Sequence, residues 1–321
     1  MLRNRGSGGR LLEGLSLRLS GSRASRLSAY DHAVSEHDQT GLRIVVISMV
    51  LPVAEPLIAY LRELGHEPVA WLMARRKEGD GRPPPPWGDV TDRTAPPGVS
   101  VLFARDKFAV APLMRALEPD VMLCWGFPWK LPQEALDVAR LGSVNQHPAP
   151  LPRLRGPSPL AWAMREGDRE FWLTWHRMDA ELDTGTILAQ TSVPIEDDET
   201  TIEQMGPKMI QASLGLLPKV FERLEAGDPG DPQATEGASW AGEFEEDYAS
   251  VDWSQPAREI HNQVRAWHLT FGMGNVPGPI AELDGERVKL LRTSLTDPGN
   301  GARPVDCGDG RLWIVESEPA E

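Results

Sequence analysis

The chain of 321 residues has room for about two domains, and its 40% hydrophobic content suffices for a buried core. Its net charge of −14 provides no overall basic field, which disfavours DNA as a partner and counts against a tRNA substrate. The two cysteines lie far apart and the seven histidines form no metal-ligand motif, so we expect no metal. No apolar run reaches the length of about 20 residues that spans a bilayer. We therefore expect a cytoplasmic protein without a membrane partner.

Residues 1–41 form a basic extension rich in serine and arginine. Glu13 is the only acidic residue before Asp31. A transit peptide has this composition, but no cleavage pattern or secretory apolar segment accompanies it. We therefore favour a loosely ordered arm or an overlong start.

Strands and helices are predicted to alternate from residue 42 onward. Short apolar runs predict strands at 42–48, 66–72, 99–103 and 120–126, and helical periodicity appears at 53–64 and 108–117. The loop at 73–98 contains four consecutive prolines, which favour polyproline II. This alternation predicts an α/β domain with a doubly wound, Rossmann-like, mostly parallel sheet.

The remaining predicted elements complete this domain at about residue 226 and then begin a second one. We expect a helix at 160–166, strands at 171–178 and 186–193, and one long amphipathic helix at 200–225. Residues 227–247 are dense in Gly, Pro and acidic residues, which is typical of a linker. A helix at 256–267 and short strands near 278–283, 287–291 and 311–315 predict a smaller β-barrel, OB-like domain over 248–321.

Candidate catalytic groups lie in the stretch 143–183, which follows strands of the predicted sheet. Asn145 and His147 are two residues apart, so in an extended segment they project to one face, and Asp183 lies on a later turn. An amide N–H stabilises negative charge on a carbonyl oxygen, an imidazole transfers protons near neutral pH, and a carboxylate orients the imidazole or takes a proton. Ligands bind beyond the carboxyl ends of such strands.

The same stretch offers no nucleophile for a covalent intermediate. Ser143 lacks a nucleophile-elbow sequence, and Cys124 lies inside an apparent buried strand. Direct acyl transfer through a tetrahedral intermediate therefore fits better than an acyl-enzyme. On composition alone, however, a loop histidine and a loop aspartate serve more often as local hydrogen-bonding groups than as catalysts.

Three motifs in order resemble the folate-dependent formyltransferase family, particularly its methionyl-tRNA formyltransferase branch. They are Asn145-Gln146-His147, the Leu-Pro-x-x-Arg-Gly loop at 151–156 and the Leu-Asp-Thr-Gly turn at 182–185. The separation between His147 and Asp183, 183 minus 147 or 36, is also typical of the family. The resemblance extends over 42–226 and resumes at 251–267.

The resemblance implies 10-formyltetrahydrofolate as the formyl donor and an amine as the acceptor. It implies that Asn145 binds the formyl oxygen, His147 polarises it, and Asp183 tunes His147 and helps remove the amine proton. It also implies two further groups of residues. The predicted folate-binding residues are Trp125, Gly126, Phe127, Leu131, Pro132, Asp179 and Leu182, and the predicted acceptor-side loop contains Arg153, Arg155 and Gly156.

The acceptor is where the sequence departs from that branch. The usual basic insertion after the second strand is replaced by the proline-rich loop at 79–98, and residues 245–321 hold seven Lys/Arg against fourteen Asp/Glu, a net −7. We therefore expect a small amine, such as an amino sugar, an amino acid or a natural-product intermediate. Initiator methionyl-tRNA is the alternative, and a non-catalytic folate-binding protein is a remote one.

Trp172, Trp175 and His176 precede the turn that carries Asp183, where the family usually has small or aliphatic residues. They are candidates for shaping an acceptor pocket, although tryptophans in strands more often serve packing. His261 and His268 are seven residues apart on one predicted helix. That spacing is too long for ordinary metal chelation, so we expect both to be core or interface residues.

Overall fold

The computed structural model describes residues 41–75, 96–270, 278–299 and 301–320. The predicted basic extension, except for Gly41, and most of the predicted proline-rich loop lie outside the described residues. Within the described ranges, no helix has both the length and the apolar character that crossing a membrane requires.

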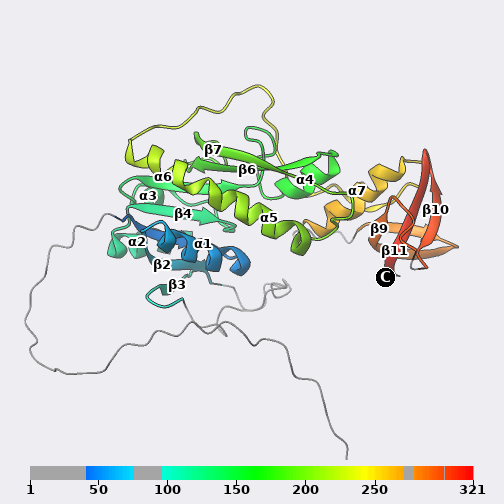
Figure 1. Ribbon diagram of the computed structural model, residues 1–321, viewed down its shortest axis with the longest axis horizontal. Coiled ribbons are helices and arrows are strands. Elements are labelled where there is room, and N and C mark those ends of the chain that lie inside the picture. Colours follow the sequence, from blue (N-terminus) through cyan, green and yellow to red (C-terminus); the bar gives the residue numbers. More distant parts are fainter. Residues whose placement is uncertain (1–40, 76–95, 271–277, 300, 321) are drawn as a thin grey trace, which may run out of the picture. The chain divides into compact units, whose positions relative to one another are not determined.

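A seven-stranded sheet forms the larger part of the described chain (Figure 1). Its strand order is β3-β2-β1-β4-β5-β6-β7. Strands β1 to β5 run parallel, β6 is antiparallel to β5, and β7 is antiparallel to β6. The strands are β1 (Arg43–Ile47), β2 (Glu67–Ala74), β3 (Ser100–Ala104), β4 (Val121–Trp125), β5 (Gly142–His147), β6 (Glu170–Arg177) and β7 (Ile187–Pro194). The mostly parallel, doubly wound sheet predicted from the sequence is confirmed.

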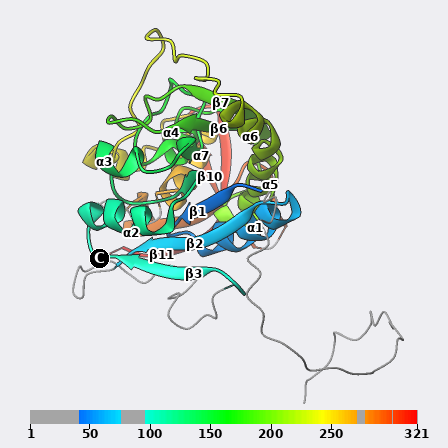
Figure 2. The same ribbon diagram turned by 90° about the vertical axis from the view of Figure 1, so that its left-hand side faces the viewer.

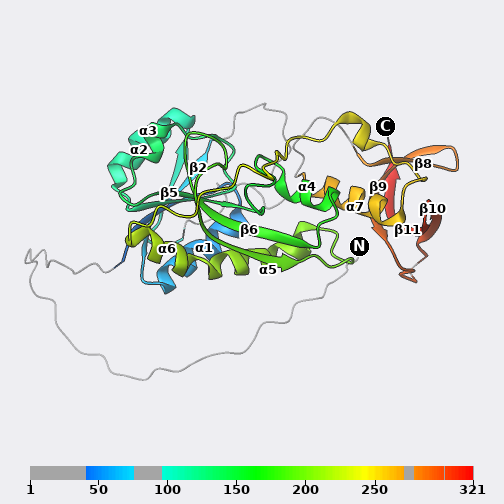
Figure 3. The same ribbon diagram turned by 90° about the horizontal axis from the view of Figure 1, so that it is seen from above.

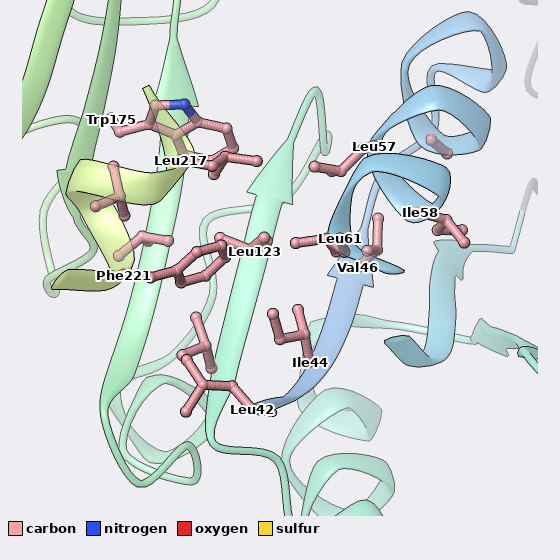
Figure 4. Close-up of a cluster of buried hydrophobic side chains, with 14 of the residues drawn as sticks. Leu42, Ile44, Val46, Leu57, Ile58, Leu61, Leu123, Trp175, Leu217 and Phe221 are labelled. Carbon is pink, nitrogen blue, oxygen red and sulfur yellow. The ribbon is translucent and has the colours of Figure 1, made fainter. Parts of the chain in front are cut away.

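Helices cover both faces of this sheet because the central strands are apolar on both sides. In β1, Ile44 and Val46 face α1 (Leu51–Glu63) and α6 (Leu217–Glu225), whereas Val45 and Ile47 face the opposite core. That second core contains α2 (Val110–Leu117), which follows the 3-10 helix η2 (Lys107–Ala109), and α3 (Gln133–Leu136). Figure 2 shows the two helical layers, and Figure 4 shows the first core around Leu123 and Phe221.

The predicted single helix over 200–225 is wrong, since two helices occupy this stretch. α5 (Ile202–Gly215) ends at Leu216, and α6 begins at Leu217 with a proline in its first turn. Pro218 cannot donate a backbone hydrogen bond, and in a continuous helix its ring would clash with the carbonyl group four residues earlier. The proline therefore begins a new helix, which packs Phe221 and Leu224 onto the sheet.

The second domain contains a four-stranded antiparallel sheet in the order β10-β11-β9-β8 (Figure 3). Its strands are β8 (Ile280–Leu283), β9 (Glu286–Ser294), β10 (Arg303–Cys307) and β11 (Gly310–Pro319). Two register shifts between β11 and β9 curl the sheet, because each irregularity bends the longer strand. The sheet is thus an open half-barrel, and the predicted smaller barrel-like domain is confirmed.

Helix α7 (Ala257–His268) joins this half-barrel to the larger domain. It packs against β9, β11 and α4 (Pro159–Arg165). Arg258 forms an ion pair with Asp197 at 2.6 Å, and the buried Arg265 donates to the backbone carbonyls of Glu196 and Glu199. The 3-10 helix η3 (Glu246–Ala249) precedes α7.

Candidate active site

The polar residues predicted from the sequence lie at the carboxyl end of β5. Cys124 of β4 lies beside Asn145 on one side, and His176 of β6 lies opposite Asn145 on the other. Asn145 is half-buried and His147 is buried. The strand pairing on both sides fixes the backbone from which these two side chains project.

Asp183 is held in place by two constraints on its turn. Its φ is +57°, a left-handed value that few residues other than glycine adopt, and the backbone N–H of Gly156 donates to Oδ2 at 2.9 Å. Gly185 is required two residues later, because a Cβ there would lie 1.8 Å from the carbonyl oxygen of Arg177. The turn therefore presents the carboxylate at one position.

The structure brings Asn145, His147 and Asp183 together, as their pattern predicted. Asn145 Nδ2 lies 3.4 Å from Asp183 Oδ1, and His147 Nδ1 lies 3.6 Å from Asp183 Oδ2. Amide, imidazole and carboxylate thus form one cluster although 36 residues separate His147 from Asp183.

The surroundings of this cluster shift the pKa values of its carboxyl, imidazole and thiol groups in different directions. Burial alone would raise the pKa of Asp183, but a hydrogen bond from the protonated ring of His176, the charge of a protonated His147 and the Gly156 N–H lower it to about 2. Burial lowers the pKa of His147, and Asp183 offsets part of that effect. Burial, with the charge of Asp183, raises the pKa of Cys124 to about 12. At neutral pH the site therefore holds an anionic carboxylate, a neutral imidazole and a neutral thiol.

The two ring nitrogens of His147 face different oxygen atoms. Nε2 lies 2.8 Å from the carbonyl oxygen of Leu154, which can only accept, so Nε2 carries the hydrogen. Nδ1 of the neutral ring then directs its lone pair toward Asp183. His147 is thus set to accept a proton at Nδ1, whereas donating from Nε2 to a substrate would require giving up Leu154.

Two residues join the cluster beyond the three predicted catalytic groups: His176, which the sequence indicates only as a candidate for shaping an acceptor pocket, and Gln233, which it does not indicate. His176 Nε2 lies 3.2 Å from Asn145 Nδ2 and 3.5 Å from Asp183 Oδ1. Gln233, in the predicted linker, donates to the carbonyl oxygens of Asp183 and Gly185 at 2.8 and 2.7 Å. The unusual histidine before the turn was a visible signal, whereas no pattern links residue 233 to a turn 50 residues earlier.

The predicted acceptor-side loop closes over the cluster through its backbone. Arg153 forms ion pairs with Glu166 and Asp168, and Arg155 donates to Gln233, so both guanidinium groups have partners within the chain. Gly156 has φ +109°, and a Cβ there would lie 3.0 Å from the ring of the exposed Trp240.

The predicted folate-binding residues lie on two neighbouring turns. Lys130 on the first forms an ion pair with Glu181 on the second at 2.9 Å. The seven residues occupy different environments: Leu131 is buried, Trp125, Phe127 and Pro132 are half-buried, and Gly126, Asp179 and Leu182 are exposed. In the parts of the chain that the structure describes, no group of three or more His, Cys, Asp or Glu side chains could hold a metal ion.

Comparison with known proteins agrees with this arrangement. Residues 100–221 match the family model described as formyl transferase, and residues 245–321 match the one described as formyl transferase, C-terminal domain. The chain therefore belongs to the formyl transferase family. It is a transferase of one-carbon groups, as its motifs predicted.

Individual relatives add detail to that placement. Methionyl-tRNA formyltransferase of Citrifermentans bemidjiense is 32% identical over 86% of this chain and 89% of that protein. The protein of the same name from Pelobacter propionicus is 35% identical over 64% of this chain, a match that spans only 66% of that relative. HypX from Aquifex aeolicus in complex with tetrahydrofolic acid shares the fold, with a TM-score of 0.61 at 20% identity over 88% of this chain and 45% of HypX.

Proposed function

We propose that the protein transfers a formyl group from 10-formyltetrahydrofolate to an amine by direct attack. The single observation that carries this proposal is the cluster of Asn145, His147 and Asp183 at the carboxyl end of β5, in a chain that belongs to the formyl transferase family. No covalent enzyme intermediate is invoked, because burial keeps the Cys124 thiol protonated by raising its pKa to about 12.

Each residue of the cluster has a distinct role in this reaction. The amine nitrogen attacks the formyl carbon, and the amide N–H of Asn145 donates to the formyl oxygen as it gains negative charge. The nitrogen must then lose a proton. Asp183 accepts and relays it to Nδ1 of His147, because a carboxyl group with a pKa of about 2 does not retain it. The bond between the formyl carbon and the folate nitrogen then breaks. His147 returns the proton, through Asp183, to that nitrogen, so tetrahydrofolate leaves with an N–H and the amine keeps the formyl group.

The two turns beside the cluster suit the formyl donor. A half-buried ring at Phe127 and the exposed Leu182 offer apolar contacts, and the ion pair between Lys130 and Glu181 ties the turns together. Apolar surface next to a few fixed polar groups is typical of sites for flat heterocyclic ligands. We propose that the residues at 125–132 and 179–182 hold the folate ring.

Methionyl-tRNA is the acceptor that the relatives favour. The match to the methionyl-tRNA formyltransferase of Citrifermentans bemidjiense extends through both domains and covers 89% of that protein. The chain also matches the family's C-terminal domain over residues 245–321. We therefore place the amino group of methionyl-tRNA first, ahead of the small amine that the charge pattern favours.

A small amine remains the second candidate because the second domain is poorly suited to a polyanion. Five of the seven cations in residues 245–321 form ion pairs, and Arg265 is buried. The five paired residues are Arg258, Lys289, Arg292, Arg303 and Arg311. Paired cations give phosphates little attraction.

The deciding experiment offers the purified full chain 10-formyltetrahydrofolate with either charged initiator methionyl-tRNA or a panel of amino sugars and amino acids. Tetrahydrofolate release and the formylated product are both measured. We expect kcat/KM for methionyl-tRNA to exceed that for every small amine, and Asn145→Ala to lower kcat by about 10²- to 10³-fold.

His147→Ala tests the chemistry independently of the acceptor. If this variant released tetrahydrofolate as fast as the wild type in the presence of acceptor, the proposed catalytic cluster would be refuted. His268→Ala is the matched control, since His268 is exposed on α7 and lies outside the cluster. Folate binding in a calorimeter without product from any amine would instead favour a binding protein.

A further inference from the structure

His176 places a second imidazole inside the cluster. It lies on β6 directly opposite Asn145 and is 2% exposed. Its Nε2 is 3.2 Å from Asn145 Nδ2 and 3.5 Å from Asp183 Oδ1. A residue that served only packing would not need a polar atom within hydrogen-bond distance of the amide proposed to bind the formyl oxygen.

The tautomer of His176 follows from its other nitrogen. Nδ1 lies 2.8 Å from the backbone carbonyl oxygen of Arg177, and a carbonyl oxygen can only accept. Nδ1 therefore carries the hydrogen, and in the neutral ring Nε2 has a lone pair. That lone pair accepts from the Asn145 NH2 group, so Asn145 turns its nitrogen rather than its oxygen toward His176.

His147 is the opposite tautomer, with its hydrogen on Nε2, so the two rings present bare nitrogens to different groups. Its Nε2–H faces the carbonyl oxygen of Leu154, and its bare Nδ1 faces Asp183. The ring centroids are 6.3 Å apart, and the two planes are nearly perpendicular at 87°. His147 thus faces the carboxylate alone, whereas His176 also faces the amide.

We propose that His176 is a positioning residue which, as its neutral Nδ1–H tautomer, fixes the orientation of the Asn145 amide so that N–H and not C=O is available to the formyl oxygen. This rests on the proposed role of Asn145. A reversed amide would direct its own oxygen toward the developing negative charge, so a wrong orientation removes the stabilisation and adds repulsion. His176 holds one NH2 hydrogen at 3.2 Å. The same nitrogen donates to Asp183 Oδ1 over a longer distance of 3.4 Å, and the second hydrogen would exchange this contact for the formyl oxygen.

Protonation of His176 would reverse this selection. A doubly protonated ring would donate from Nε2 to Asp183 Oδ1, and it would favour the Asn145 oxygen over its nitrogen. The charged or titratable groups facing this ring are Asp183 from the turn after β6 and His147 from β5, and Cys124 of β4 lies on the far side of Asn145. The adjacent Arg177 directs its guanidinium to the carbonyls of Leu141 and Asp228 instead.

The tautomers can be measured on the wild-type protein without any activity. Long-range ¹H–¹⁵N correlation spectra of the imidazoles distinguish a protonated nitrogen from a bare one. At neutral pH we expect His176 with Nδ1 protonated and Nε2 bare, and His147 with the reverse. A His176 ring protonated at Nε2 would overturn the proposal, because such a ring cannot accept from the amide.

Two substitutions separate positioning from packing. His176→Met fills a similar volume without an acceptor, whereas His176→Gln places an oxygen near the position of Nε2. We expect His176→Met to lower kcat about 10- to 100-fold, less than the full loss of an oxyanion donor, with little change in KM for the folate. His176→Gln should recover most of that loss, and equal losses in both variants would overturn the proposal.

A double variant tests whether the effect acts through Asn145. In the Asn145→Ala background, His176→Met should lower kcat by less than about twofold, because the amide it positions is gone. Full additivity would overturn the proposal. A wild-type protein without formyl transfer to any acceptor would instead refute the proposed function, and the imidazole spectra would still decide the orientation of Asn145. Should His176→Met fail to fold, those spectra and His176→Gln carry the test.

Discussion

Asp183 keeps its charge although it is 9% exposed, because several groups around it favour the anion. Two imidazoles and the backbone N–H of Gly156 surround the carboxylate, and they lower its pKa to about 2 against the effect of burial. Desolvation without these partners would have favoured the protonated acid. The charge at the centre of the site therefore depends first on the two histidines and also on the loop that carries Gly156.

Gly156→Ala should disrupt this loop. A Cβ at Gly156 would lie 3.0 Å from the carbonyl oxygen of Ala241 and 3.0 Å from the Trp240 ring, at a backbone φ of +109°. We expect the free energy of unfolding to fall by about 1 to 3 kcal/mol and kcat to fall with it, since the N–H to Asp183 shifts. Urea denaturation and steady-state kinetics measure the two effects.

Gly237→Ala is the matched control for that prediction. Gly237 lies in the same segment as Trp240 and has a φ of +75°, but nothing lies within 4 Å of its Cβ position. This variant should show the strain of a left-handed alanine alone, about 1 kcal/mol, with kcat unchanged. Equal effects of the two substitutions on kcat would contradict a role for close packing at Gly156.

At the scale of elements, six strands of the main sheet could be predicted because their apolar runs are short and bounded by turn signals. β5 was expected only as an extended segment, since Asn145, Gln146 and His147 interrupt its apolar pattern. β10 was not predicted, since its five residues are exposed or half-buried and show no apolar pattern. The break between α5 and α6 had a local signal in Pro218, which was outweighed by the continuous amphipathic pattern on both sides.

The site was predictable to the extent that it depends on motifs. The motifs around Asn145, His147 and Asp183 identified the cluster, but the contact between His176 and Asn145 depends on which residues face each other in β5 and β6. Such a register is set by tertiary packing and by the turn between the strands. The contact of Gln233 with the Asp183 turn likewise depends on the path of a segment without regular structure.

Helix α7 contains a buried histidine that should make its docking sensitive to pH. His261 is 0% exposed, donates from Nε2 to the Asp197 carbonyl at 3.0 Å, and in its neutral form accepts at Nδ1 from the Thr293 hydroxyl at 2.8 Å. Burial, followed by the charge of Arg265, lowers its pKa to about 4. His261 stays neutral in the folded protein at pH values where the unfolded chain has bound a proton.

The free energy of unfolding should therefore fall on acidification from about pH 6.5 to about pH 4. The unfolded state binds the proton first in this window, so stability is full above the unfolded pKa and is lost below it, by on the order of 3 kcal/mol from His261. Urea denaturation across this range should show a shallower slope for His261→Gln. His268→Gln, exposed on the same helix, should keep the wild-type slope.

At the scale of the whole molecule, the first domain carries the proposed formyl transfer site, and the second domain has a negative net charge. The chain carries −14 overall and −7 in residues 245–321, and most cations of that second region are paired. A protein that grips a polyanion normally has a positive face. If methionyl-tRNA is the acceptor, its binding must depend on few phosphate contacts and mainly on the amino acid and the end of the tRNA that carries it.

This reasoning predicts a shallow salt dependence for methionyl-tRNA. Two phosphate contacts would lower kcat/KM about tenfold between about 50 and about 200 mM KCl, whereas six or more would lower it by about 10³-fold or more. We expect the smaller loss, and we expect kcat/KM for an uncharged small amine to change by less than about twofold over the same range. A loss of 10³-fold would show a strong basic path that the paired cations do not predict. Methionyl-tRNA kinetics without any salt dependence would instead indicate that the tRNA backbone is not contacted, which would favour the small-amine acceptor.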